Sequence, residues 1–122
     1  MNSLQRNGKI YLTLPSPPSL NQLYGHKING HTYKKTAHRK FTDNVKQMCT
    51  VQYQGKPLSC NLYMELRWYR PARRGDIDSC LKTLLDAMQG FIYDKDSQIE
   101  KLLITKDYDK ARPRMEVMVV PI

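Results

Sequence analysis

The strongest constraint on the fold is a strictly alternating segment at residues 60–68. Single polar or amphipathic residues separate its apolar positions, which are Cys60, Leu62, Met64, Leu66 and Trp68. Successive side chains of a β-strand point to opposite faces, so this period of two predicts a strand with one face in the core. We therefore expect a β-sheet whose apolar face is covered by other parts of the chain.

Two further segments have the periodicity of amphipathic helices. The first, from Thr36 to about Gln52, has apolar residues at Ala37, Phe41, Val45, Met48 and Cys49. Its basic residues are expected largely on other faces: His38, Arg39, Lys40 and Lys46. The second, from Asp78 to Gln89, has apolar residues at Leu81, Leu84, Leu85 and Met88. Gly90 is the natural stop of this second helix, which is expected to pack on the sheet.

Three other segments are predicted to be strands. Alternation from Lys9 to Leu14 predicts the first, a second is expected within Gln98 to Tyr108, and the run M-E-V-M-V-V at 115–120 predicts the last. We find no internal repeat, low-complexity tract or domain linker in the sequence. The predicted fold is therefore a single α+β domain over residues 1–122, with a mixed β-sheet packed with two main helices.

Length and composition exclude several classes of protein. A chain of 122 residues can bury roughly two thirds of its unfolded surface without disulfides. No apolar run approaches the ~20 residues that span a bilayer, and the N-terminus lacks the apolar region of a secretory signal. The three cysteines, Cys49, Cys60 and Cys80, form no C-x-x-C pair, and we interpret them as reduced, with two of them in the core. A cytoplasmic protein without a membrane partner is expected.

The formal net charge of +9 favours an acidic partner, and nucleic acid fits better than a membrane because no long basic amphipathic helix is evident. Candidate contacts to DNA phosphates are Arg70, Arg73, Arg74, Lys34 and Lys35. The two lysines lie in a stretch of cations and tyrosines that suits phosphates and bases, but equally suits a polar surface loop. The roles of His26 and His31 in the same stretch stay open.

Acidic residues are crowded between Arg73 and Gln98. Five of the eleven in the chain lie there: Asp76, Asp78, Asp86, Asp94 and Asp96. Carboxylates placed close together repel one another unless a cation lies between them, so this crowding in a basic chain suggests a metal site that faces an anionic partner. Oxygen ligands suit Mg²⁺, whereas zinc would fit poorly. Such a site can activate water and stabilise charge on a phosphodiester, with one metal ion or two.

Helical spacing places Lys82 one turn beyond Asp78 and Asp86 one turn beyond Lys82, on a stripe away from the leucines. Lys82 could then donate to a scissile phosphate or an attacking water. The third carboxylate is Asp96 or Asp94. Simpler interpretations exist: Asp76 or Asp78 could cap the helix, and residues 94–97 could form an Asx-type turn. A D-x-D pair also occurs in sugar-nucleotide transferases, but this chain is short and lacks a doubly wound pattern.

Three separated blocks of this chain resemble the RusA family of Holliday junction resolvases, small phage-associated crossover junction endodeoxyribonucleases. The blocks are P-x-P-P-S-x-N from Pro15, D-I-D-S-C-L-K-x-x-L-D-A from Asp76, and G-F-I-Y-D-K-D-S-Q-I from Gly90. The resemblance implies that Asp76, Asp78 and Asp96 bind magnesium, with Mn²⁺ a possible substitute, and that Lys82 is the catalytic lysine. Asp86 matches the helix acid of the family, with no role assigned.

The resemblance also implies a bacterial or phage-encoded homodimer that nicks two opposing strands of a four-way junction symmetrically and leaves 5′-phosphate ends. Two departures are present: Ser79 replaces a common Asn, and Lys95 separates Asp94 from Asp96 where many members have adjacent acids. Counting from Gly90 and from the S-Q pair favours Asp96 as the third ligand. The alternatives are a flap or other branched-DNA endonuclease, and a noncatalytic basic DNA-binding module.

Overall fold

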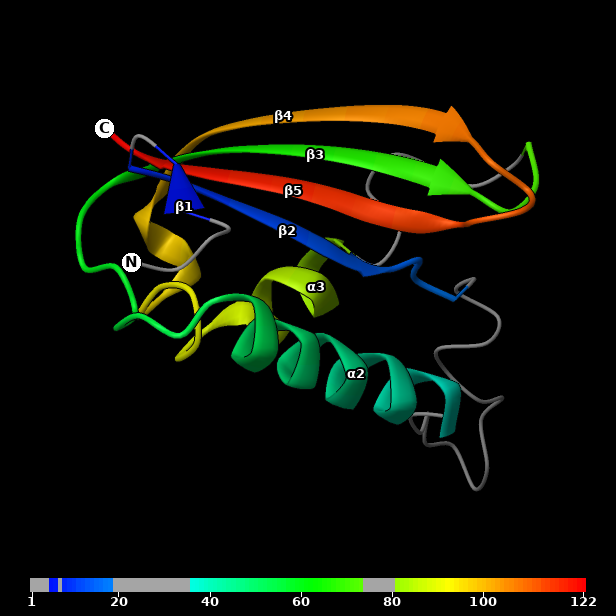
Figure 1. The fold of residues 1–122 in the computed structure, drawn as a ribbon, viewed down its shortest axis with the longest axis horizontal. Helices are drawn as coiled ribbons and strands as arrows, with labels where there is room; N and C mark the ends of the chain where they lie inside the picture. Colours follow the sequence, from blue (N-terminus) through cyan, green and yellow to red (C-terminus); the bar gives the residue numbers. More distant parts are fainter. Residues whose placement is uncertain (1–4, 7, 19–35, 74–80) are drawn as a thin grey trace, which may run out of the picture.

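The computed structural model describes residues 5–6, 8–18, 36–73 and 81–122. Its strands are β1 (Gln5–Arg6), β2 (Lys9–Pro15), β3 (Leu62–Arg70), β4 (Ile99–Tyr108) and β5 (Arg114–Pro121). Its helices are α2 (Thr36–Gln52), α3 (Leu81–Met88) and the 3-10 turn η1 (Asp96–Gln98). The strands form one five-stranded sheet with the spatial order β1-β2-β5-β3-β4, to which β1 contributes two residues (Figure 1).

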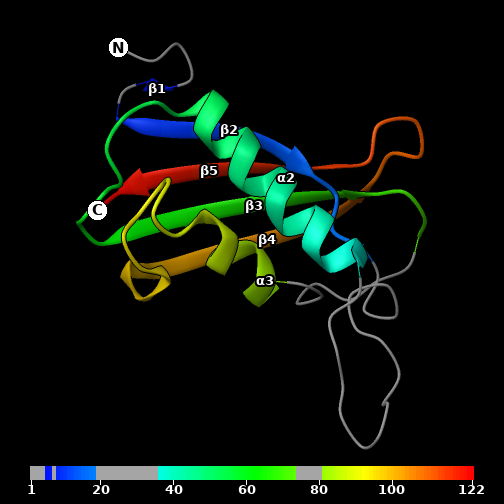
Figure 2. The same cartoon turned by 90° about the horizontal axis from the view of Figure 1, so that it is seen from below.

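The sheet is mixed because one pair of strands is parallel. Strand β3 pairs parallel with β4, whereas β2 and β3 both pair antiparallel with the central strand β5. A parallel pair needs a crossover of a dozen or more residues, and α3 and η1 lie within the crossover from β3 to β4. This connection places both elements on one face of the sheet, beside the strands that it joins (Figure 2).

The apolar face of the sheet is the core of the protein. The inward positions of β3 are buried as predicted: Leu62, Met64, Leu66 and Trp68 are at most 7% exposed. The predicted start of this strand was wrong, because β3 begins at Leu62, and Cys60 is an exposed free thiol before it. Two of the three cysteines were expected in the core: Cys49 is buried, and Cys80 lies outside the described residues.

Helix α2 packs on the sheet through the stripe that its sequence predicts. Phe41, Val45 and Cys49 are buried. His38 is also buried, at 7% exposure, so the expectation that it lies on another face was wrong. It precedes Phe41 by three positions and Thr42 by four, and therefore lies at the margin of the buried face.

Helix α3 packs beside α2 and covers the same face of the sheet (Figures 1 and 2). Its Leu84 and Met88 are buried, and Leu81 and Leu85 are half-buried against the core. Gly90 ends this segment with a φ of +84°, a conformation that costs glycine little because it has no Cβ. Both predicted main helices are therefore present, on one face of a mixed sheet, and the α+β class is confirmed.

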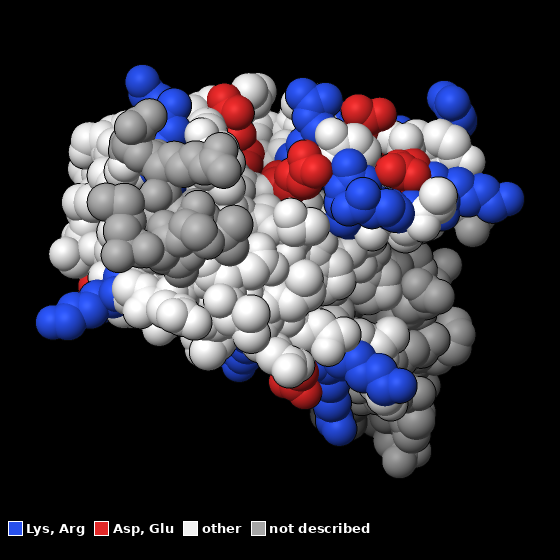
Figure 3. All heavy atoms as spheres, viewed as in Figure 1, with Lys and Arg blue, Asp and Glu red and all other residues white. Residues whose placement is uncertain are grey.

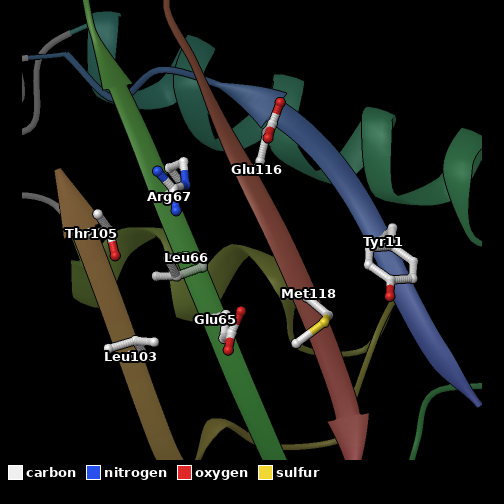
Figure 4. Close-up of a pocket in the computed structure, with 8 residues that line it drawn as sticks. All are labelled: Tyr11, Glu65, Leu66, Arg67, Leu103, Thr105, Glu116 and Met118. Atoms are coloured by element: carbon white, nitrogen blue, oxygen red, sulfur yellow. The ribbon is translucent and has the colours of Figure 1, made fainter. Parts of the chain in front are cut away.

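The opposite face of the sheet is covered by none of the described helices. A hollow of about 220 Å³ lies on this face, and Figure 4 shows the residues that line it. Its lining comes from four strands and mixes apolar with charged side chains: Tyr11, Glu65, Leu66, Arg67, Leu103, Thr105, Glu116 and Met118. None of the helices in the described part of the chain is long and apolar enough to cross a membrane.

We predict that Leu84→Ala lowers the free energy of unfolding by about 2–5 kcal/mol, because Leu84 is 1% exposed and its loss leaves a cavity between α3 and the sheet. Val51→Ala is the matched control, since Val51 is 66% exposed on α2. Urea unfolding midpoints measure both. Equal midpoints for the two variants would contradict the packing of α3.

Candidate active site

The structure describes some of the predicted site residues and not others. Lys82, Asp86, Asp94, Asp96, Arg70 and Arg73 are described. The remaining candidates lie outside the described residues: Asp76, Asp78, Arg74, Lys34, Lys35, His26 and His31. The site can therefore be built from α3, from η1 and from the end of β3.

Lys82 connects two aspartates at the centre of the described site. Its Nζ lies 3.0 Å from Oδ1 of Asp86, one turn along α3, and 3.0 Å from Oδ2 of Asp96 in η1. The first contact follows from helical spacing, as the sequence predicted. The second joins residues 14 apart in sequence and depends on the return of the chain from α3 toward β4.

These contacts hold Lys82 in its charged form. The pKa of Lys82 is raised, first by the hydrogen bond to Asp86 and then by the one to Asp96. The lysine side chain is 77% exposed, so water screens the pairs and their contribution to stability is small. Their consequence is positional, because they direct an ammonium group toward the carboxylate that the sequence analysis favoured as a metal ligand.

Asp96 and Asp94 differ in their surroundings. The Asp96 side chain is 24% exposed and contacts Lys82. Asp94 is exposed, and its backbone N–H donates to the carbonyl of Leu58 at 3.1 Å. Of the two acids, Asp96 is thus the one whose carboxylate contacts Lys82.

Two glutamines fix the backbone around Asp96. The N–H of Asp96 donates to Oε1 of Gln89 at 2.8 Å, and the N–H of Lys95 donates to Oε1 of Gln98 at 2.7 Å. Nε2 of Gln98 donates in turn to the carbonyls of Leu58 and Cys60, at 2.8 and 2.9 Å. We call Gln89 and Gln98 the amide clamp. It ties η1 both to the residue that follows α3 and to the segment before β3.

A buried tyrosine supports the same turn. Tyr93 is fully buried, and its hydroxyl donates to the carbonyl of Leu85 at 2.7 Å. Burial raises its pKa, so the phenol stays protonated and remains a donor. Neither Tyr93 nor the amide clamp was predicted from the sequence. The S-Q pair that helped to align Asp96 was the available signal.

Helix α2 contributes polar residues that the sequence analysis did not connect with the site. His38, Thr42 and Lys46 lie at i, i+4 and i+8 and line a hollow of about 200 Å³ together with Lys82 and Asp86 of α3. Thr42 Oγ1 is buried and has no hydrogen-bond partner within the described structure. The four-residue spacing was the sequence signal for this stripe, because such residues share one helix face.

The two described arginines of the predicted DNA contacts lie at the carboxyl end of β3. Arg70 Nε donates to the carbonyl of Asp107 at 2.9 Å. The guanidinium of Arg73 lies 4.6 Å from the centre of the Tyr108 ring. Cations and acids are interspersed over this end of the sheet (Figure 3), where Arg67 pairs with Asp107.

Arg114 also lies at this end of the sheet, and its role there is structural. Its guanidinium lies 3.8 Å from the centre of the Tyr69 ring, and it pairs with Asp109 and Glu116. The pKa of Asp109 is lowered, first by a hydrogen bond from the Arg112 backbone and then by Arg114. These contacts hold the turn between β4 and β5.

The chemistry of the donors fits a hard cation. The described residues contain no group of three acidic, histidine or cysteine side chains that could hold a metal ion. Asp96 is the described member of the predicted set, whose other members are Asp76 and Asp78. All three offer carboxylate oxygens, which suit Mg²⁺ and do not suit zinc.

For the amide clamp, we predict that Gln98→Ala accelerates hydrogen exchange at the Lys95 amide and lowers the free energy of unfolding by about 1 kcal/mol, because one donor and two carbonyls lose their partner. NMR-detected exchange and urea unfolding measure the two effects. Gln47→Ala, at an exposed position of α2, is the control. Unchanged exchange at Lys95 would show that Gln98 does not hold η1.

For Lys82, we predict that Asp86→Asn lowers its pKa more than Asp96→Asn does, because the Asp86 hydrogen bond is the larger cause of the raised value. The ion pairs stabilise the fold below the unfolded-state pKa of lysine, and this contribution is lost as pH rises through the raised folded-state pKa. NMR titration of the Lys82 side chain in the alkaline range measures the shifts. Asp43→Asn, exposed on α2, should leave the Lys82 titration unchanged.

Comparisons with known proteins bear on the family of this chain. The family model for endodeoxyribonuclease RusA matches residues 15–120, which include α2, β3, α3 and η1. The uncharacterized protein YqaN of Bacillus subtilis (strain 168) is 40% identical over 50 residues, which are 41% of this chain and 34% of YqaN. The aligned part thus spans about a third of that relative. Because the family model covers most of the chain, the protein belongs to the RusA endodeoxyribonuclease family.

Proposed function

We propose that the protein is a magnesium-dependent, structure-selective endodeoxyribonuclease that resolves four-way DNA junctions by paired, symmetric nicks. Family membership supports this proposal. The observation that carries it is the position of Lys82, whose Nζ lies 3.0 Å from both Asp86 and Asp96. An ammonium beside a carboxylate that can accept a metal ion is suited to stabilising charge on a phosphodiester.

In this proposal Asp76, Asp78 and Asp96 hold the magnesium ion, and Mn²⁺ can replace it. When bound, the ion would neutralise charge on the scissile phosphate and lower the pKa of the attacking water. Asp96 is suited to the role of a metal ligand because its backbone N–H donates to Oε1 of Gln89, which limits the movement of Asp96. A ligand held before the ion arrives loses less conformational freedom on binding.

Lys82 has a separate role. A lysine ammonium carries three N–H donors, so two carboxylates leave one for another acceptor. With Asp96 engaged as a metal ligand, Lys82 would be retained on α3 by its ion pair with Asp86. Lys82 can then donate to a nonbridging oxygen of the scissile phosphate, where charge develops during cleavage.

Contacts to the DNA backbone are assigned to Arg70, Arg73, Arg74, Lys34 and Lys35. Of the two described members, Arg70 also donates to the Asp107 carbonyl, whereas the Arg73 guanidinium is stacked on an aromatic ring. Phosphate contacts would set affinity and its dependence on salt. A homodimer would supply two equivalent active sites to the two equivalent scissile phosphates of a junction.

The test is a digest of four-way junction, flap and duplex DNA with and without Mg²⁺. We expect magnesium-dependent cleavage of the junction, with a loss of about 100-fold or more in Asp96→Asn and in Lys82→Met, because each removes a group placed at the reacting phosphate. Asp94→Asn is the matched control, two residues away and exposed. Both Asn variants should still bind junctions, since the backbone contacts are unchanged.

Three outcomes would change the proposal. Loss of cleavage in Asp94→Asn with normal cleavage in Asp96→Asn would move the third ligand to Asp94. Preferred cutting of the flap would make the protein a different branched-DNA endonuclease. Binding of junctions without magnesium-dependent cleavage of any substrate would indicate a noncatalytic DNA-binding module.

A further inference from the structure

Strand β4 forms one margin of the sheet and exposes apolar residues on both of its faces. Leu102 is 38% exposed and Leu103 is 51% exposed, and they point to opposite faces because they are adjacent in a strand. On one side β4 pairs with β3 from Ile99 to Tyr108, with a register shift that leaves Glu100 without a partner in β3, and none of the described strands pairs with its other side. Figure 4 shows Leu103 on this outermost strand, on the face without helices.

A long edge strand with exposed apolar side chains is a template for pairing with another strand. Strand β4 has ten residues, about 33 Å of unpaired backbone donors and acceptors at the usual strand rise. Its charged residues are Glu100, Lys101, Lys106 and Asp107, two of each sign. In a chain of net charge +9, a margin without net charge is poorly suited to nucleic acid. It is better suited to a partner with the same mixture of groups.

The sequence of β4 is complementary to itself in one antiparallel register. With Leu103 opposite Leu103 of a second copy, Leu102 lies opposite Ile104 and Glu100 lies opposite Lys106. Directly opposite residues of an antiparallel pair share a face, and every one of these pairs obeys that parity. The exposed Glu100 and Lys106 thereby form two cross-strand pairs of opposite charge, one on each side of the twofold axis.

Neighbouring registers are less favourable. Moving the centre to Leu102 places Lys101 opposite Leu103 and Glu100 opposite Ile104. Moving it to Ile104 places Leu102 opposite Lys106. In both cases a charged side chain faces an apolar one within two residues of the axis. In the register at Leu103 such a mismatch lies only at the strand ends, where Asp107 faces Ile99, while centring on Ile104 exchanges the Glu100–Lys106 pairs for Lys101–Asp107 pairs. The twofold register at Leu103 is thus selected by the apolar pairs at its centre, and the Glu100–Lys106 pairs are compatible with it.

We propose that the free edge of β4 is the surface through which two copies of this chain associate, antiparallel about Leu103, to form one continuous sheet of both copies. This inference rests on the homodimer of the proposed function and identifies the surface that forms it. The twofold axis runs perpendicular to the sheet, so α2, α3 and Lys82 of both copies lie on the same side of the assembly. One branched DNA molecule could contact both sites from that side.

The test reverses the charges of Glu100 and Lys106, which face one another across the twofold axis, and measures the mass of the assembly instead of DNA cleavage. Multi-angle light scattering with size exclusion should give the intact protein twice the 14.3 kDa chain mass. Glu100→Lys and Lys106→Glu each place like charges opposite one another twice, and each should weaken dimerisation about tenfold or more. An equimolar mixture of the two variants, and the double variant, should both recover the wild-type dimer, because opposite charges face one another again.

Two further variants separate the interface from the fold. Leu103→Arg should give a monomer with an unchanged circular dichroism spectrum, since Leu103 is half exposed and lies outside the core. Lys110→Glu, in the exposed turn after β4, makes the same charge change as Lys106→Glu and should remain dimeric. A monomeric wild type, a dimer that all these substitutions leave unchanged, or a mixture that fails to recover dimers would each overturn the proposal.

The outcome is independent of the nuclease assignment. If the charge variants change the dimer mass as predicted but the wild-type protein cleaves no DNA, the β4 interface stands and the proposed function is wrong. If the protein cleaves junctions and its dimer is unchanged by the β4 substitutions, the proposed function stands and the β4 interface is wrong.

Discussion

Burial of one face of a single sheet is the interaction on which the described structure depends. Helices α2 and α3 both pack on that face, and their apolar stripes meet the inward residues of β2, β3 and β5. Because β3 and β4 are parallel, the chain must cross the sheet between them, and it does so on the covered face. The candidate site therefore lies on the helical side, where the crossover passes from α3 into η1.

The site combines a backbone held by neutral hydrogen bonds with a lysine held by ion pairs. The amide clamp holds the backbone at Lys95 and Asp96 through uncharged hydrogen bonds. The Lys82 pairs are exposed and weak individually, but both raise the pKa of the lysine and hold it beside Asp96. Such a division would suit the proposed metal site, because Asp96 would stay fixed while Asp86 retains the lysine on α3.

The open face and the β4 margin differ from the site in their chemistry. Apolar and charged side chains of both signs are mixed there, as Glu65, Arg67, Leu103 and Met118 show (Figure 4). Interspersed charges do not form the continuous positive surface that a DNA backbone requires. We therefore propose protein association for the open face and the free edge of β4, whereas the candidate active site lies on the helical side.

The sequence alone determined the elements, because a period of two or 3.6 reports directly which side chains must be buried. It also determined the Lys82–Asp86 contact, which one helical turn dictates, and the family, through motifs of fixed spacing. Tertiary structure decided the rest. It decided the order of the strands, the burial of His38 and the exposure of Cys60. It also decided the Lys82–Asp96 contact and the hydrogen bonds from Gln98 to Leu58 and Cys60, which join residues 14, 40 and 38 positions apart. Local periodicity holds no information about such pairs, since they depend on how the elements pack.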